Sequence, residues 1–539
     1  MGRAGLRLLL FPYAAQIRKL QNLNCRRKGP KEEMEEAEPE TLEGFLAWAA
    51  ELGISDSLHN FQSQKPRICL GNSLVVSFFP DAGGRGLGAA RDLRKGELIL
   101  RVPKSALLTR DSLLKDGILS SAANGHRCLS PTQIMTVCLL YEMGKGKNSF
   151  WYPYLKHLPR SYEILATFSE FEKQALQVDD AVWTTEKAIS KAETEWKQAT
   201  LLMQELKLKP RLLSLRAWIW ASATISSRTL HIPWDEVGCL CPVGDLFNYA
   251  APGGESKDIE NVENLMHSSS LQDDSLSSGH STDSLLVERY DAQLQRLTDG
   301  GYDDDIGAYC FYARNNYKKG EQVLLSYGTY TNLELLEHYG FLLNKNPNDK
   351  VFIPLEPSMY SCNSWPKESM YIHQDGQPSF ALLSALRLWT TPQSQRRSIG
   401  HLAYSGSQLS VENEISVLKW ISQNCRVILN TLPTTVEGDS LLLFTIDEIQ
   451  NAGNPMELRK LLCQLESEAC AFLEANSLQK EENGGELVLS RKTKRSIERW
   501  KLAVEWRLRY KKILVDCISY CSETINYLSS QNFSTVRTK

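Results

Sequence analysis

Three short segments of the sequence hold the residues whose types and spacing could do chemistry. GGRGLG covers 83–88, GDLFNY covers 244–249 and SYGTYTNLELLEHYGF covers 326–341. A glycine cluster is a weak signature of nucleotide binding. The second segment offers the hydrogen-bonding groups of an Asp and an Asn. The third offers tyrosines, whose rings are apolar and whose hydroxyls are polar.

Each segment alone has a simpler explanation. A glycine cluster between strands is usually a turn. Tyrosines beside a strand end usually pack against neighbours. An Asp and an Asn in a loop usually make turn hydrogen bonds. Taken singly, the segments therefore define no function, and their combination and order must carry the interpretation.

In this order the segments resemble the SET domain, in the branch of the Rubisco large-subunit lysine methyltransferase. The resemblance runs from about residue 40 to 530. It implies an α+β fold, a β-rich SET domain of short strands with a helical insertion, followed by an all-α C-terminal domain. It also implies S-adenosylmethionine as the cofactor and methyl transfer to the side-chain amine of a lysine in a protein substrate.

The resemblance assigns roles to individual residues. Tyr327 matches the catalytic tyrosine, and Asp245 and Tyr339 match substrate-binding positions. The cofactor-binding positions are Gly83, Gly84, Arg85, Arg228, Asn248 and Tyr249.

Two of these assignments and one further glycine carry structural expectations. Tyr249 replaces the histidine of the family's DLxNH segment, at a position thought to meet the adenine through its backbone. Gly86 is expected to hold a turn. Arg228 would clamp the cofactor carboxylate with paired hydrogen bonds, and a buried structural ion pair is the alternative.

The expected chemistry explains these residue types. A lysine with a solution pKa near about 10.4 must lose its proton before it attacks a methyl group. An aromatic channel disfavours the ammonium form by desolvation, and a nearby sulfonium acts in the same direction. Backbone carbonyls and the Tyr327 hydroxyl would aim the methyl group through CH···O contacts. Alignment is then expected to contribute most, roughly 7–11 kcal/mol.

Two other functions remain open from the sequence. One is a non-catalytic SET-fold adaptor that binds a protein partner through its helical domain. The other is a protein-histidine methyltransferase of the same fold. A non-histone substrate is expected, because the cysteine-rich zinc segments that flank many histone-directed SET domains are missing.

Five regions are predicted to position the site. They are an extension at 1–35, the first part of the SET domain at 36–110, a helical insertion at 111–227, the second part of the SET domain at 228–344, and an all-helical, substrate-binding-like domain at 345–539. Several domains are expected because single cores stop growing near roughly 250–300 residues.

Short strands are predicted on both sides of the insertion. SLVVSFFP, GLGAARD and ELILRVP follow one another from Ser73, separated by turn clusters. AYCFYARNNYKKGEQVLLSYG, from Ala308, predicts two strands paired through the turn at 318–321. Glycine should supply a positive φ in this turn and in the similar turn at 94–97.

Amphipathic periodicity predicts helices in the insertion and after Asn344. Residues 253–305, rich in Ser, Gly and acids, are expected to be a disordered acidic loop. The basic stretch at 491–512 is interpreted as a solvated helix face, with a site for an acidic partner as the alternative.

Bulk properties exclude some functions. A net charge of −3 makes nucleic acid an unlikely partner, and no apolar run is long enough to span a bilayer. The 13 cysteines show neither a disulfide framework nor zinc spacing, so no metal site is expected. A monomer is expected. Residues 1–30 resemble a transit peptide or follow from a mis-assigned start, so the expected location is cytoplasmic or nuclear, or else plastid or mitochondrion.

Overall fold

The structure is a computed structural model of the chain. It describes residues 41–57, 67–80, 84–252, 300–360, 364–451 and 490–536, together with 468, 471–472 and 475–476. The expected extension at 1–35, Gly83 and residues 253–299 of the expected acidic loop lie outside the described residues. The end of that loop region is ordered instead, because Gly300–Asp303 forms strand β7.

The two parts of the predicted SET domain contain small sheets, as expected for a SET fold. β1 (Leu74–Phe79) and β2 (Gly84–Ala89) form an antiparallel hairpin. β3 (Leu98–Pro103) pairs with β8 (Ala308–Tyr312), which in turn pairs with β7. A further hairpin joins β4 (Thr229–Ile232) to β5 (Asp235–Leu240).

One strand prediction is wrong. β8 and β9 (Leu324–Leu325) do not pair with each other, although the turn between them forms. β9 pairs in parallel with β6 (Asn248–Tyr249), and β8 pairs with β3. The turn glycine Gly320 has φ +90° and its counterpart Gly96 has φ +80°, which confirms the conformation predicted for both turns.

The insertion is helical, as predicted. Its main helices are α5 (Pro131–Lys145), α8 (Asp179–Glu205) and α9 (Leu215–Arg228). Apolar residues from α5, α8 and α9 join those of β3 and β8 in one large core. α2 (Leu42–Glu51) packs on the same core and begins at Thr41, whose hydroxyl accepts from the Gly44 N–H.

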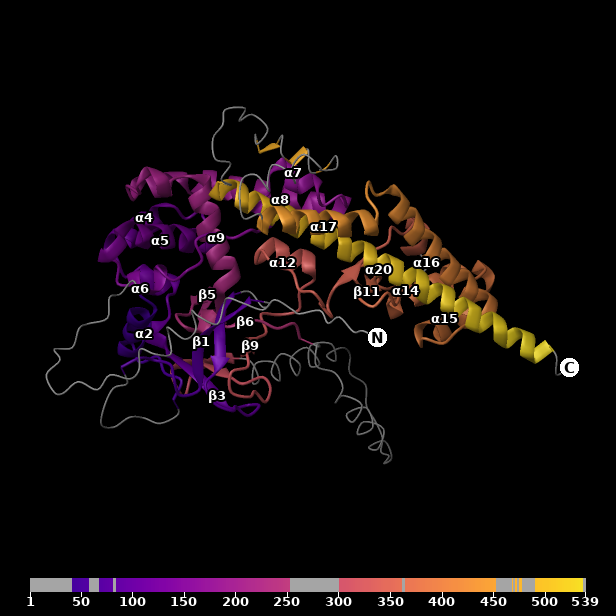
Figure 1. The fold of residues 1–539 in the computed structure, drawn as a ribbon, viewed down its shortest axis with the longest axis horizontal. Helices are drawn as coiled ribbons and strands as arrows, with labels where there is room; N and C mark the ends of the chain where they lie inside the picture. The colour runs from indigo at the N-terminus through magenta and orange to yellow at the C-terminus, as the bar shows by residue number, and fades with distance from the viewer. Residues whose placement is uncertain are drawn as a thin grey trace, which may run out of the picture.

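The C-terminal domain is mainly helical but begins with a small β-sheet. β10 (Lys350–Val351) pairs with β11 (Ile372–His373). Helices α14 (Phe380–Trp389), α15 (Gln393–Tyr404), α16 (Val411–Thr431), α17 (Val436–Asn451) and α20 (Arg491–Val536) follow. Figure 1 shows α20, in yellow, running from the helices of the insertion to the far end of this domain.

The basic stretch on α20 is partly internal, which corrects its interpretation as a solvated face. Arg495 and Arg499 both pair with Glu163 of the insertion, at 2.9 and 2.8 Å. Further along α20, Arg507 pairs with the buried Asp439 of α17 at 2.7 Å. These basic residues therefore join α20 to its neighbours instead of facing water.

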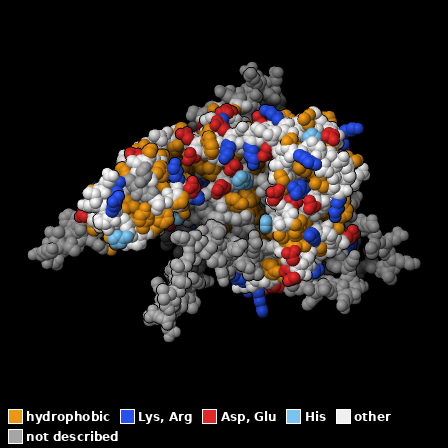
Figure 2. All heavy atoms as spheres, turned by 180° about the vertical axis from the view of Figure 1, so that it is seen from behind, with side chains coloured by type: hydrophobic (Ala, Val, Ile, Leu, Met, Phe, Trp, Pro, Cys, Tyr) orange, Lys and Arg blue, Asp and Glu red, His pale blue; other side chains and the backbone are white. Residues whose placement is uncertain are grey.

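On the face seen in Figure 2, basic and acidic side chains of the described residues are interspersed, and no patch of one charge sign dominates. Within the described chain, no helix has an apolar stretch of the length and hydropathy needed to cross a membrane.

Candidate active site

Two of the predicted segments, 244–249 and 326–341, meet within the SET domain. The parallel pairing of β6 with β9 sets Asn248 opposite Leu324 and Tyr249 opposite Leu325. The chain then continues from β9 into the tyrosine-containing segment, so residues 244–249 and 326–330 lie side by side. This pairing brings together residues that are far apart in the sequence.

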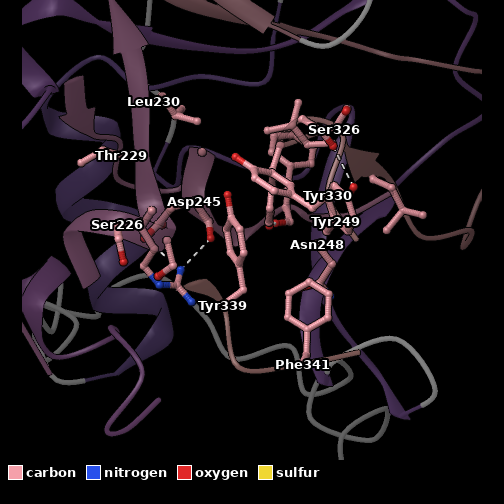
Figure 3. A pocket seen from close by; sticks show the side chains of 18 of the residues that line it. Ser226, Thr229, Leu230, Asp245, Asn248, Tyr249, Ser326, Tyr330, Tyr339 and Phe341 are labelled. Atoms are coloured by element: carbon pink, nitrogen blue, oxygen red, sulfur yellow. Dashed lines mark hydrogen bonds and ion pairs between the residues drawn. The ribbon is translucent and has the colours of Figure 1, made fainter. Parts of the chain in front are cut away.

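A cavity of about 950 Å³ opens beside this pair of strands. Its walls come from the end of α9, the segment containing β6, the segment after β9, and residues 339–345. The residues that matter below are Tyr162, Arg228, Asp245, Asn248, Tyr249, Tyr327, Gly328, Tyr330, Tyr339 and Phe341. Figure 3 shows several of these side chains gathered around the same space.

Aromatic rings form one side of the cavity. Tyr327 stacks on Tyr339 with ring centroids 5.4 Å apart and an angle of 25°. Tyr249 lies 5.1 Å from Tyr327, and Tyr330 lies 5.4 Å from Tyr339 edge-on. Phe341 closes the group at 6.0 Å from Tyr339. The predicted catalytic and substrate-binding tyrosines thus share one aromatic wall.

The phenols of Tyr249, Tyr327 and Tyr339 stay protonated at neutral pH. Burial raises the pKa of Tyr327 and of Tyr339 well above the ordinary value of 10. Burial also raises the pKa of Tyr249 to about 12. The Tyr327 hydroxyl donates to the Phe247 carbonyl, so its oxygen keeps its lone pairs for other contacts. These tyrosines can orient and desolvate a ligand, but they offer no phenolate base.

An ion pair faces the aromatic wall. Arg228 Nη1 donates to the Asp245 carbonyl oxygen at 2.8 Å and to its Oδ2 at 3.1 Å. The Tyr154 hydroxyl donates to the same Oδ2 at 2.9 Å, and Arg228 Nε donates to the Tyr162 hydroxyl at 3.1 Å. Burial lowers the pKa of Arg228, but Asp245 and the neighbouring tyrosines raise it above its ordinary value on balance.

This geometry changes the role expected for Arg228. Nε and Nη1 already have protein acceptors, whereas Nη2 has none among the described residues. A clamp that uses both terminal nitrogens is therefore not available, because Nη1 is committed to Asp245. The structural ion pair that was the alternative is present, and it leaves the two N–H groups of Nη2 for a ligand.

The glycine-rich strand lies outside the cavity lining. Gly84 begins β2 opposite Phe79 with φ +87°, and Gly86, expected in a turn, lies within β2 opposite Ser77. A Cβ on Gly86 would stand 2.6 Å from the Asn248 amide nitrogen, so this glycine lets β2 approach the site. The Arg85 side chain turns away and donates to the His157 carbonyl at 2.6 Å.

A strained residue precedes Asp245. Val243 has φ +69°, a conformation that costs a β-branched residue roughly 1–3 kcal/mol. The next residue must be glycine, because a Cβ on Gly244 would stand 2.6 Å from the Phe311 ring. The surrounding core therefore imposes this turn, and the turn presents Asp245 to Arg228.

The cavity collects most of the predicted site. Arg228, Asp245, Asn248, Tyr249, Tyr327 and Tyr339 line it, whereas Gly84 and Arg85 do not. Sequence reasoning missed Tyr330 and Phe341, although they belong to the same segment as Tyr327. It also missed Tyr154 and Tyr162 of the insertion, which hydrogen-bond to Asp245 and Arg228, and of which Tyr162 also lines the cavity.

The fold resembles that of solved proteins. It superposes on "Structure of Rubisco LSMT bound to Sinefungin and Monomethyllysine" with a TM-score of 0.52 and 19% identity, over 92% of this chain and 94% of that one. "Structure of Rubisco LSMT bound to AdoMet" gives a TM-score of 0.50 and 18% identity, over 90% and 93% of the two chains. The family model "Rubisco LSMT substrate-binding" matches residues 359–514.

The fold, the cavity and these comparisons define the class, and the chain belongs to the Rubisco LSMT-like family of SET-domain methyltransferases. Membership follows from a close relative, "Protein SET DOMAIN GROUP 40" of Arabidopsis thaliana. The two are 57% identical over 496 residues, which cover 91% of this chain and 97% of the relative. The chain is also 25% identical to "Actin-histidine N-methyltransferase" of Gallus gallus, over 70% of this chain and 61% of that protein.

Proposed function

We propose that this protein transfers a methyl group from S-adenosylmethionine to the side-chain amine of a lysine in a non-histone protein. The observation that carries the proposal is the aromatic cavity beside the Arg228–Asp245 pair. Its described lining contains one acid, Asp245, which is held by Arg228 and Tyr154. The site thus favours a nucleophile that arrives without its proton over one that needs a base.

The cavity has features that fit the cofactor. The free Nη2 of Arg228 would donate to the carboxylate of S-adenosylmethionine. Asn248, packed against the glycine-bearing strand β2, would position the cofactor from the other side. Structures of a fold relative were solved with AdoMet and with AdoHcy. When bound, the cofactor supplies a methyl group carried on a sulfonium sulfur, and its leaving group is the corresponding thioether.

The residues of the chain would prepare the amine and aim it. The stacked rings of Tyr327 and Tyr339 desolvate an incoming side chain, which lowers the pKa of an ammonium and releases its proton to solvent. The Tyr327 oxygen, whose proton is engaged by Phe247, would accept a CH···O contact from a methyl group on the sulfonium. The amine lone pair would form the new N–C bond as the C–S bond breaks and its electron pair stays on the sulfur.

Transfer to histidine is the second candidate, and a specific observation favours it. The actin-histidine methyltransferases are 23–25% identical to this chain over 70–82% of its length. A neutral imidazole needs no deprotonation before attack, so a cavity in whose described lining the one carboxylate, Asp245, is held by Arg228 and Tyr154 suits it as well. Lysine is preferred because the apolar ring faces of Tyr327 and Tyr339 suit an unbranched alkyl side chain.

Labelled cofactor tests the proposal. The protein is first titrated with S-adenosylmethionine by calorimetry, then incubated with plant extract and methyl-labelled cofactor, and labelled bands are hydrolysed to amino acids. Label in methyl-lysine supports the proposal, and label in methyl-histidine replaces it with the second candidate. A folded protein that binds no cofactor would instead be a non-catalytic adaptor.

A further inference from the structure

Tyr249 occupies the position where the family motif has histidine, and its side chain does not point away from the site. It lines the cavity with its ring 5.1 Å from that of Tyr327. Its hydroxyl donates to the Gly328 carbonyl at 2.8 Å. A hydrogen bond from the Tyr330 backbone N–H lowers the pKa of this phenol, although burial has the larger effect and raises it. The substituted side chain is therefore held by the segment after β9.

The two segments brace each other through two phenols. Tyr327 reaches from the segment after β9 to the Phe247 carbonyl, and Tyr249 reaches from β6 to the Gly328 carbonyl. The pair flanks the parallel backbone pairing of Asn248 with Leu324 and of Tyr249 with Leu325. Gly328 has φ +131°, a conformation that few other residues adopt, so the bond from Tyr249 fixes an otherwise permissive point of the chain.

We propose that Tyr249 is a positioning residue of the transfer site, which holds the 326–330 segment so that Tyr327 faces the cavity. This inference rests on the proposed function and deepens it. The tyrosine that replaces the family histidine then makes one of two reciprocal hydrogen bonds, Tyr249 to Gly328 and Tyr327 to Phe247. These two hydrogen bonds together are the clasp between the segments. A phenylalanine at 249 would keep the ring but release Gly328, and a histidine would lack the hydroxyl that reaches Gly328.

Hydrogen exchange and kinetics on Tyr249→Phe test the inference together. Amide exchange of the peptide spanning 326–331 should rise in the variant, because the hydroxyl that bonds Gly328 is lost. Turnover should fall roughly three- to tenfold, the size of one net hydrogen bond. The dissociation constant for S-adenosylmethionine should stay within about twofold, since the Tyr249 hydroxyl faces the loop and not Arg228. Tyr249→His should behave in the same way.

Tyr404→Phe is the matched control. The Tyr404 hydroxyl accepts from the Ser364 N–H at 3.2 Å in the C-terminal domain, and Tyr404 does not line the cavity. This variant also loses a tyrosine hydroxyl but should change neither the exchange of 326–331 nor turnover. A merely structural role of Tyr249 would lower thermal stability without moving turnover.

The outcomes separate the inference from the proposed function. Unchanged exchange at 326–331 overturns the clasp, and raised exchange with unchanged turnover overturns the positioning role. Exchange is measured without an acceptor, so it still judges the clasp where the wild-type protein transfers no methyl group. In that case the proposed function fails, and the positioning role fails with it.

Discussion

The cavity and the junction between α17 and α20 each join segments that are distant in the sequence, the first through neutral hydrogen bonds and the second through buried ion pairs. At the cavity, β6 and the segment after β9 are joined by neutral phenols that donate to carbonyls. At the junction, Arg507 and Lys511 of α20 converge on the fully buried carboxylate of Asp439, at 2.7 and 2.6 Å. The junction tolerates buried charge because every charge there has a partner.

The difference follows from what each region must do. Net charge beside a methyl-transfer site would bind or repel the sulfonium and the amine, so neutral hydrogen bonds suit its walls. The charge that the cavity does hold, on Arg228, is balanced by Asp245. The junction has no ligand to accommodate, and its paired charges give α20 a defined position against α17 and the insertion, where Arg507 also donates to the Ala175 carbonyl at 2.7 Å.

The largest expected effect comes from breaking the junction. Asp439→Asn leaves Arg507 and Lys511 buried with less compensation, so it should destabilise the protein by about 3–5 kcal/mol. Denaturant unfolding followed by tryptophan fluorescence measures this change. Asp447→Asn is the control, because its partly exposed pair with Lys501 should contribute no more than about 1 kcal/mol. Equal losses in both variants would contradict the distinction between the buried and exposed pairs.

A smaller effect is expected at the cofactor side of the cavity. Asn248→Ala should weaken binding of S-adenosylmethionine about tenfold, or about 1.4 kcal/mol, while leaving the aromatic wall in place. Calorimetric titration measures the change. If the variant binds as tightly as the wild-type protein, Asn248 has no part in holding the cofactor.

The smallest effect is a pH dependence of the protein's stability that comes from His157. His157 Nε2 lies 3.2 Å from the Thr41 carbonyl and must donate to it, so Nδ1 accepts from Arg85 Nη1 at 3.3 Å. Burial, and then Arg85, lower the His157 pKa below its ordinary value of 6.5. The unfolded chain therefore binds a proton before the folded one does, and stability should fall as the pH drops below 6.5.

Thermal melts between neutral and mildly acidic pH check this expectation. His157→Gln should show a flatter profile over that window, because it removes the titrating group. A wild-type profile that does not steepen relative to the variant would show that His157 keeps its ordinary pKa.

Local patterns in the sequence predicted much of the fold. The helices of the insertion and of the C-terminal domain follow from amphipathic periodicity, and the positive φ of Gly96 and Gly320 follows from turn chemistry. The partners of β8 and β9 did not follow, because a turn fixes where the chain reverses but not which strand lies beside it. The parallel pairing of β9 with β6 is a long-range contact that no local pattern encodes.

The site shows the same limit. Tyr327, Tyr339 and Asp245 could be found because they lie in recognisable segments. Tyr154 could not, because it lies 91 residues before its partner Asp245 and only the packing of the insertion brings them together. The contact of the Tyr249 side chain with Gly328 could not be predicted from the sequence either, because it depends on the crossing of two segments.

Single-turnover methyl transfer by Tyr327→Phe tests the central claim most directly. The variant should fold, bind S-adenosylmethionine like the wild-type protein and transfer at least about 100-fold more slowly, because the methyl group loses its aiming contact and the ring loses its tether to Phe247. The matched control is again Tyr404→Phe, which should transfer at the wild-type rate. Transfer by Tyr327→Phe at the wild-type rate would contradict the assignment of this cavity as a tyrosine-aligned methyl-transfer site.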